Sequence, residues 1–232
     1  MNTKVIELEL KIFLMRNIMS SEALEDISKL IDRSLLKTQK YADFHKKNKY
    51  KYYTFCSLWP LEANKIYKKG NIYSIKIRTV HEELAEHFEE YLVNEYTDSM
   101  KALTINKRYL PKKHIGKIYN ITPSIAKFED GYWRENQSLE TYERRIKDNI
   151  IKKYNDFFNT KIDEDFELFN MIKFENIKPI STKYKNISLL GDKMTLYITE
   201  NEMAQEMAYF ILGTGLLEMG SRGFGYCNYK WI

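Results

Sequence analysis

The chain is poor in cysteine, in glycine outside one short segment, and in long apolar runs. Cys56 and Cys227 are its two cysteines, too few for a disulfide framework and without the spacing of metal ligands, so we expect reduced thiols. No run of about 18 apolar residues occurs, so no transmembrane helix is expected. The N-terminal segment is acidic, contains lysine and lacks the apolar core of a signal peptide. We therefore expect a cytoplasmic protein that does not associate with membranes.

Composition and length are those of a folded, soluble protein. Of the 232 residues, 44% are hydrophobic and 30% are charged, unlike the composition of a disordered chain. This length suffices for one large domain or two small ones, each with a buried core. The formal net charge of +5 is modest and by itself argues only weakly for a polyanionic partner.

Basic and aromatic residues are concentrated between residues 37 and 53. The segment contains Lys37, Lys40, Lys46, Lys47, Lys49 and Lys51, interspersed with Tyr41, Phe44, Tyr50, Tyr52 and Tyr53. Lysines neutralise phosphate and aromatic rings stack on bases, so this mixture suits RNA. Enrichment in lysine, asparagine, isoleucine and tyrosine is also typical of an AT-rich coding sequence, so composition alone does not establish RNA binding.

Five of the nine glycines lie in residues 213–225, GTGLLEMGSRGFG, close to the C-terminus. A Walker loop requires lysine after its second glycine, but Gly220 is followed by Ser221 and Arg222. A dinucleotide-binding loop requires a third glycine where this chain has Glu218, and too few residues follow for its helix. Apolar residues flank the segment on both sides, which indicates that it joins packed elements.

Hydrophobic periodicity predicts a βαββαβ order in the first half of the chain. Residues 6–12 alternate apolar and polar side chains, as in a half-buried strand. Apolar residues at helical spacing then predict a helix that starts after Ser20 and ends near Lys40. The remaining elements are expected as strands at 50–59 and 73–78, a helix at 81–95 and a strand at 102–109.

The second half of the chain repeats this order. We expect strands at 119–128, 166–174, 193–199 and 223–231, with helices at 139–154 and 202–212. The predicted fold class is therefore α+β, with two tandem ferredoxin-like (RRM-like) βαββαβ domains and a C-terminal glycine-rich loop. The predicted domains are 1–115 and 116–232.

The ending Gly223-Phe224-Gly225, the tandem fold that it closes and a histidine after the first helix together resemble the Cas6 family of CRISPR-associated endoribonucleases. The resemblance spans most of the chain. Family members commonly carry a further G-x-G shortly before this ending. In this chain, the usual distance between the G-x-G and the GFG ending places Leu217 where a glycine is expected. If Gly213 and Gly215 are taken as the G-x-G instead, the distance to the GFG ending is longer than usual.

The resemblance implies a metal-independent endoribonuclease that cleaves CRISPR precursor RNA (pre-crRNA) within its repeats. In such enzymes the RNA 2′-hydroxyl attacks the adjacent phosphate, which leaves a 2′,3′-cyclic phosphate and releases guide crRNAs. No cofactor and no metal are implied. The implied partners are the CRISPR repeat RNA and a CRISPR interference complex, and a homodimer is left open.

Two alternatives keep RNA as the ligand but change the function. One is a protein that binds CRISPR repeats without cleaving them. The other is a general RRM-like RNA-binding protein, whose RNP1 signature is matched by residues 222–226, RGFGY, only at its opening.

His45 is the leading candidate for the general acid or base. Imidazole titrates near neutral pH, and the catalytic histidine of the family lies in this region. The resemblance places Lys51 where a lysine would stabilise charge, and Tyr41 where it would hold the 2′-hydroxyl or the phosphate. The alternative for His45 is a solvated loop histidine among lysines, and His114 in a basic connection is the next candidate.

Three sets of residues are expected to contact RNA. They are Lys46, Lys47 and Lys49 beside His45; Gly215, Gly220, Gly223 and Gly225 with Arg222 in the loop; and the basic helix with Arg144, Arg145, Lys147, Lys152 and Lys153. The loop has a structural alternative, in which its glycines adopt positive φ to return the last strand to the sheet. The basic helix has the alternative of an ordinary solvated face.

Overall fold

A computed structural model gives the fold and describes residues 3–185 and 187–232. The first half of the chain forms a four-stranded antiparallel sheet in the order β3-β5-β1-β6. Its strands are β1 (Ile6–Leu14), β3 (Tyr53–Phe55), β5 (Ile72–Thr79) and β6 (Met100–Tyr109). The alternation in β1 separates two faces: Leu8, Leu10 and Ile12 are fully buried, whereas Glu9 and Lys11 are partly exposed.

Three helices accompany this sheet: α1 (Ala23–Leu35), α2 (Gln39–Lys46) and α3 (Glu82–Tyr91). Ile27 and Ile31 of α1, with Leu84 and Phe88 of α3, join the strand residues in one hydrophobic core. A short two-stranded ribbon pairs β2 (Ile18–Met19) with β4 (Ile66–Tyr67). We refer to residues 3–110 as the N-terminal unit.

The second half of the chain repeats the arrangement with its own sheet and core. Strands β7 (Ile115–Asn120), β8 (Phe169–Phe174), β11 (Met194–Ile198) and β12 (Cys227–Trp231) pair antiparallel in the order β12-β7-β11-β8. In both sheets the first long strand lies between the third and the fourth, which is the ferredoxin-like order. We refer to residues 115–232 as the C-terminal unit.

The helices of the C-terminal unit are α4 (Trp133–Asn136), α5 (Leu139–Phe158) and α6 (Glu202–Thr214). Ser138 accepts a hydrogen bond from a backbone N–H in the first turn of α5, and Asn201 does the same for α6. These caps satisfy N–H groups that have no partner within the helix, and so fix where each helix begins.

The tandem α+β fold predicted from the sequence is confirmed, with local differences. The helix expected to end near Lys40 ends at Leu35, and residues 39–46 form a separate helix, α2. The strand expected at 119–128 is β7, which begins earlier and ends at Asn120.

A hairpin of β9 (Ile180–Tyr184) and β10 (Ile187–Gly191), between β8 and β11, has no counterpart in the expected order. Residues 110–114 link the two sheets beside the expected division at residue 115, which stays a prediction. Within the described part of the chain, no helix combines the length and the apolar character needed to cross a membrane.

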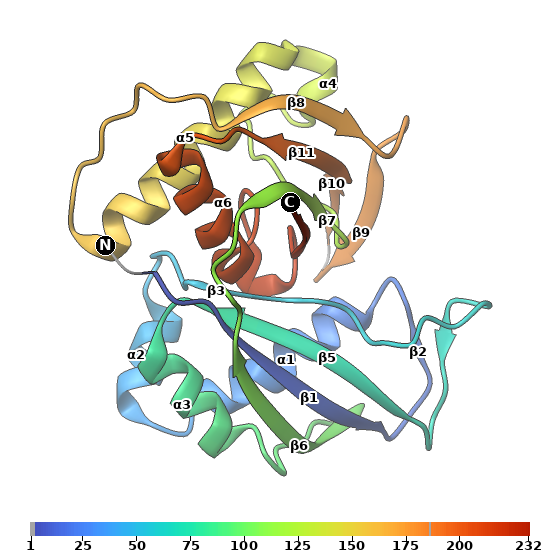
Figure 1. Cartoon of the computed structure of the whole chain (residues 1–232). Coiled ribbons are helices and arrows are strands. Elements are labelled where there is room, and N and C mark those ends of the chain that lie inside the picture. Colours follow the sequence, from blue (N-terminus) through green and yellow to red (C-terminus); the bar gives the residue numbers. More distant parts are fainter. Residues whose placement is uncertain (1–2, 186) are drawn as a thin grey trace.

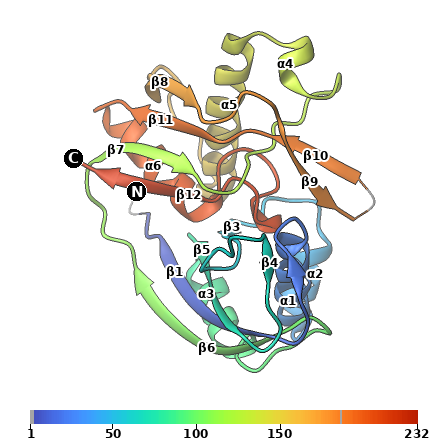
Figure 2. The same ribbon diagram turned by 90° about the vertical axis from the view of Figure 1, so that its right-hand side faces the viewer.

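The two units meet through α6 and through a polar contact at Arg78. Gly213 of α6 packs so closely on the end of β5 that a Cβ would lie 2.6 Å from Val80 Cγ1. Arg78 of β5 donates to the carbonyl oxygen of Cys227 at 2.6 Å and to Glu7 at 2.7 Å. Figures 1 and 2 show the N-terminal unit below the C-terminal unit, with the glycine-rich segment at their junction.

Candidate active site

The glycine-rich segment, residues 213–225, is buried against the N-terminal unit. Gly223 has φ +82°, and a Cβ there would lie 2.6 Å from the ring of Phe55 in β3. Gly225 has φ +67°, and a Cβ there would collide with the carbonyl oxygen of Leu216. Both positions therefore require glycine, because of the left-handed backbone and the close packing.

The backbone N–H groups of these two glycines already have partners inside the protein. Gly223 N–H donates to the Gly220 carbonyl at 2.9 Å, and Gly225 N–H donates to the Pro123 carbonyl at 2.9 Å. Gly215 ends α6, and Gly220 is also buried. For Gly223 and Gly225 the geometry favours the structural interpretation of the glycines over direct contact with RNA.

The aromatic residue of the GFG ending is also inaccessible. Phe224 is 1% exposed and belongs to the hydrophobic core of the N-terminal unit, and Tyr226 is equally buried. Base stacking by an RNP1-type motif needs exposed rings. The partial RNP1 match at residues 222–226 therefore does not form a stacking surface.

Arg222 projects from a short 3₁₀ turn, Gly220–Arg222, within this segment. Its Nη1 donates to both carboxylate oxygens of Asp32 at 2.7 Å, and Asp32 lies on α1 of the N-terminal unit. The loop thus delivers its basic side chain across the junction between the units. Asp32 has no distinguishing sequence motif, because its partner lies 190 residues away.

His45 joins the same carboxylate from the last turn of α2. Its Nδ1 lies 3.4 Å from Asp32 Oδ1, and its side chain is 23% exposed. The interpretation of His45 as a solvated loop histidine is therefore wrong: the residue is helical and half-buried. We call Asp32, His45 and Arg222 the Asp32 cluster.

The surroundings of the imidazole determine its protonation. Burial lowers the pKa of His45 below its ordinary value, and the positive charges of Arg222 and Lys51 act in the same direction. The Asp32 carboxylate opposes them but does not reverse the shift. With Nδ1 directed at Asp32, the other ring nitrogen, Nε2, is the one left for a ligand.

Lys51 lies beside the Asp32 cluster and closes the C-terminal end of α2. Its Nζ donates to the carbonyl oxygens of Phe44, of His45 at 3.2 Å and of Lys47 at 2.7 Å. Three N–H donors therefore meet three backbone acceptors. Lys51 holds the helix end that carries His45 and adds positive charge nearby, and burial lowers the pKa of Lys51.

Tyr41 is not brought to the Asp32 cluster. It lies one turn before His45 on α2, but its ring packs on His87 of α3 with the centroids 4.1 Å apart. Its buried hydroxyl has no hydrogen-bond partner among the described residues, and burial raises the pKa of Tyr41. The expected role of Tyr41 at the 2′-hydroxyl has no geometric support.

The other basic residues expected to contact RNA divide into two groups. Lys46, Lys47 and Lys49 are exposed around the end of α2, close to His45. On α5, Arg144 is exposed, whereas Arg145 forms an ion pair with Glu218 of the loop. The basic residues of α5 therefore do not form one solvated face.

His114, the second histidine candidate, is exposed in the link between the sheets and lines a surface depression with Glu206 and Tyr154. Cys56 and Cys227 are buried free thiols. In residues 3–185 and 187–232, no group of three or more His, Cys, Asp and Glu side chains is arranged to hold a metal ion.

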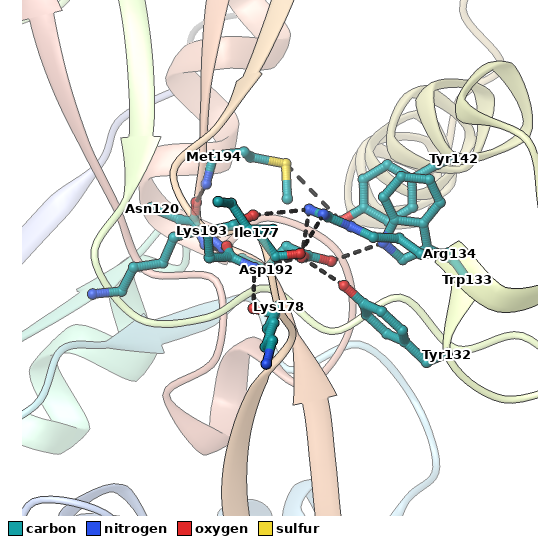
Figure 3. A network of polar contacts seen from close by, with 11 residues as sticks. Asn120, Tyr132, Trp133, Arg134, Tyr142, Ile177, Lys178, Asp192, Lys193 and Met194 are labelled. Atoms are coloured by element: carbon teal, nitrogen blue, oxygen red, sulfur yellow. Dashed lines mark hydrogen bonds and ion pairs between the residues drawn. The ribbon is translucent and has the colours of Figure 1, made fainter.

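A second polar cluster lies in the C-terminal unit, around the fully buried Asp192 (Figure 3). Its carboxylate accepts hydrogen bonds from Tyr132 at 2.7 Å, Trp133 at 2.7 Å, Arg134 at 3.0 Å and Asn176 at 2.8 Å. Four donors from two segments surround one carboxylate, so this cluster fixes α4 against the sheet and leaves no position for a ligand.

Comparison with known proteins identifies relatives across nearly the whole fold. The family model described as CRISPR associated protein Cas6, C-terminal, matches residues 118–229. A protein of Methanocaldococcus jannaschii, the CRISPR-associated endoribonuclease Cas6 2, is 24% identical over 223 residues, covering 84% of this chain and 87% of the relative.

Solved structures give the same result for the fold. One, described as CRISPR associated protein Cas6, superposes with a TM-score of 0.70 at 20% identity and covers 97% of this chain and 99% of its own. Another, described as an RAMP protein binding different RNA substrates, superposes with a TM-score of 0.74 at 17% identity over the same shares. At these identities the structural likeness establishes the tandem ferredoxin-like architecture.

Proposed function

We propose, from the premise that the chain belongs to the Cas6 family, that it is an endoribonuclease that cleaves CRISPR precursor RNA within its repeats. The observation that carries the proposal is the Asp32 cluster. It places a half-buried imidazole, a carboxylate and a guanidinium together at the junction of the two units. Exposed lysines border it on the side of α2.

The chemistry is an internal transfer of the phosphate ester. The RNA 2′-oxygen attacks the adjacent phosphorus, the bond to the 5′-oxygen breaks, and the product ends are a 2′,3′-cyclic phosphate and a 5′-hydroxyl. A base must take the proton from the 2′-hydroxyl, and the 5′-oxygen must gain one. No metal ion and no cofactor take part in this scheme.

His45 fits the role of the base. With its pKa lowered, the imidazole is mostly neutral at pH 7 and can accept the 2′-hydroxyl proton at Nε2. The imidazolium so formed is stabilised by Asp32 and can return the proton to the 5′-oxygen. Arg222 and Lys51 add positive charge beside the phosphate as its negative charge increases.

The experiment uses RNA transcribed from a CRISPR array of the source genome, incubated with the full chain in excess EDTA. We expect cleavage at one position in each repeat, with a 2′,3′-cyclic phosphate on the upstream product. RNA with a single 2′-deoxy nucleotide before the scissile phosphate is the matched control and should remain intact. Cleavage of the 2′-deoxy RNA, or cleavage that EDTA abolishes, contradicts the proposed chemistry.

A second function, repeat binding without cleavage, is favoured by one observation. The charges that would stabilise the transition state are already engaged, Lys51 by three carbonyl groups and Arg222 by Asp32. Such a protein would bind repeat RNA tightly and leave it uncut in the EDTA experiment. Both functions have the same RNA partner.

Assembly with an interference complex, or assembly as a homodimer, is a further proposal. Co-purification tests both assemblies.

A further inference from the structure

A cavity of about 170 Å³ lies next to the Asp32 cluster, at the junction of the two units. It is lined by Tyr50, Lys51 and Tyr52, which follow α2, and by Gly220 and Ser221 of the glycine-rich loop. Lys153 of α5 also lines it, and we call it the Lys153 cavity. This volume holds several water molecules or one phosphate group.

Lys153 is a buried ammonium group, 5% exposed. Its Nζ donates to the carbonyl oxygens of Gly215, at 3.0 Å, and of Leu217. An ammonium group has three N–H donors, so one remains after these two contacts. Across residues 3–185 and 187–232, no carboxylate forms an ion pair with Lys153. The negative charge of Glu218 raises the pKa of Lys153 but does not offset the effect of burial, and a bound anion would stabilise the buried ammonium group further.

The side chains that line the cavity carry more positive than negative charge. Lys49, Lys51 and Lys127 line it together with Lys153, against one carboxylate, that of Glu218. Glu218 is itself paired with Arg145. Burial lowers the pKa of Lys153 to about 8, which still leaves it mostly protonated at pH 7. The field in the cavity therefore favours an anion.

Aromatic residues also line the cavity. The rings of Tyr50 and Tyr52 lie with their centroids 6.2 Å apart, and the Tyr52 hydroxyl donates to Asp156 of α5. The lining therefore offers an ammonium donor for a phosphate and aromatic surface for an attached nucleoside. Lys51 donates all three of its N–H groups to backbone carbonyls, whereas the buried Lys153 donates two and keeps a third for a ligand.

We propose that the Lys153 cavity binds one phosphate group of the RNA chain, close to but distinct from the phosphate that is cleaved. The third N–H of Lys153 donates to a non-bridging oxygen, and the neighbouring nucleoside lies against Tyr50. The inference rests on the proposed RNA substrate and adds a subsite that fixes the register of the strand. Free inorganic phosphate has the same chemistry, so the experiment separates the two sources.

The test measures binding of an uncleavable repeat RNA, with 2′-deoxy at the scissile nucleotide, whose phosphates are replaced one at a time by neutral methylphosphonate. We expect one linkage near the scissile position whose neutralisation weakens binding by wild-type protein about tenfold, as for loss of a charge-assisted contact. With Lys153→Gln, which keeps two N–H donors but removes the charge, that linkage should have no further effect. The slope of log affinity against log salt should also fall by roughly 0.7 to 0.9.

Each outcome decides one point. Lys68→Met, an exposed lysine of the N-terminal unit, is the matched control and should leave the methylphosphonate profile unchanged. If repeat RNA binds but no linkage responds to Lys153→Gln, the subsite is wrong while the proposed substrate stands. If no repeat RNA binds at all, the proposed function itself fails.

A further arm does not depend on the folding of the Lys153 variant. Inorganic phosphate is added to wild-type protein at constant ionic strength, with chloride as the control. It should compete with the unmodified uncleavable repeat RNA. It should not compete with the repeat RNA that carries a methylphosphonate at the identified linkage. Stabilisation of the free protein by phosphate without any competition would assign the cavity to a free anion and overturn the RNA assignment.

Discussion

Asp192 and Asp32 are both held by arginine side chains, but in very different surroundings. Asp192 is 0% exposed and accepts four hydrogen bonds from neighbouring side chains, so its carboxylate is closed to any ligand. Asp32 is 26% exposed and is shared between Arg222 and the imidazole of His45. The first carboxylate is saturated with donors and stabilises one unit. The second is open, lies between units and contacts a group that titrates near neutral pH.

Removing the closed carboxylate should have the largest effect on stability. Asp192→Ala removes the acceptor of the buried Trp133 N–H and of the Tyr132 hydroxyl and breaks the ion pair with Arg134, so we expect a loss of about 3–5 kcal/mol in the free energy of unfolding. Urea unfolding followed by circular dichroism measures it. Asp98→Ala, an exposed aspartate, is the control and should change stability by less than about 0.5 kcal/mol. Equal losses in the free energy of unfolding for Asp192→Ala and Asp98→Ala would contradict a stabilising role of the buried Asp192 carboxylate.

Neutralising the open carboxylate should instead act mainly on cleavage. Asp32→Asn keeps an acceptor for Arg222 but removes the charge that orients and stabilises the imidazolium. We expect the single-turnover cleavage rate to fall about tenfold to a hundredfold, less than the 10²–10⁴ that general acid–base catalysis contributes.

Asp26→Asn is the matched control for this change. Asp26 also lies on α1 and also pairs with an arginine, Arg16, at 2.7 Å. Because that pair lies outside the Asp32 cluster, the variant should cleave at the wild-type rate. A loss of rate as large as that of Asp32→Asn would show that the effect comes from α1 and not from the open carboxylate.

Removing the arginine of the open cluster should weaken binding moderately. Arg222→Ala deletes a guanidinium beside the proposed phosphate position, so we expect about tenfold weaker binding of uncleavable repeat RNA. The fold should remain intact, as judged by the unfolding transition. Arg16→Ala removes a comparable contact to α1 and should leave RNA affinity unchanged. Unchanged affinity in Arg222→Ala would leave the glycine-rich loop with its structural role alone.

The smallest effect is on the titration of His45, measured by NMR of its ring protons. The pKa should lie below the ordinary value of about 6.5 in wild-type protein. It should rise in Arg222→Ala, which removes a neighbouring positive charge, and fall further in Asp32→Asn. Because the unfolded state binds the proton more readily, the stability contributed by His45 is present above about pH 6.5 and is lost as the pH falls below it. Shifts in the opposite directions would contradict the electrostatic account of the cluster.

The elements with regular periodicity were predictable from the sequence. Alternation in residues 6–12 gave β1, and helical spacing gave α5 and α6, because one buried face imposes a repeat on the sequence. The hairpin β9–β10 escaped prediction because half of its residues are exposed and only Thr182 and Gly191 are buried, so no apolar alternation marks it.

The candidate site was predictable only in part. His45, Lys51 and Arg222 stood out by residue type and position, whereas Asp32 looks like any other acidic residue on a helix surface. Its role depends on a contact with Arg222, 190 residues away, which only the packing of the two units creates. The close packing of Gly223 has the same origin, since it meets Phe55 and Leu24 of the N-terminal unit, whereas Gly225 meets Leu216 of its own segment.

The most direct test of the Asp32 cluster as an active site is the single-turnover cleavage rate of repeat RNA by His45→Ala, with binding measured in parallel. We predict a fall of about 10²–10⁴-fold in rate with RNA affinity retained. His114→Ala, the exposed histidine of the link, should cleave at the wild-type rate. Cleavage by His45→Ala at the wild-type rate, or a loss confined to His114→Ala, would contradict the account.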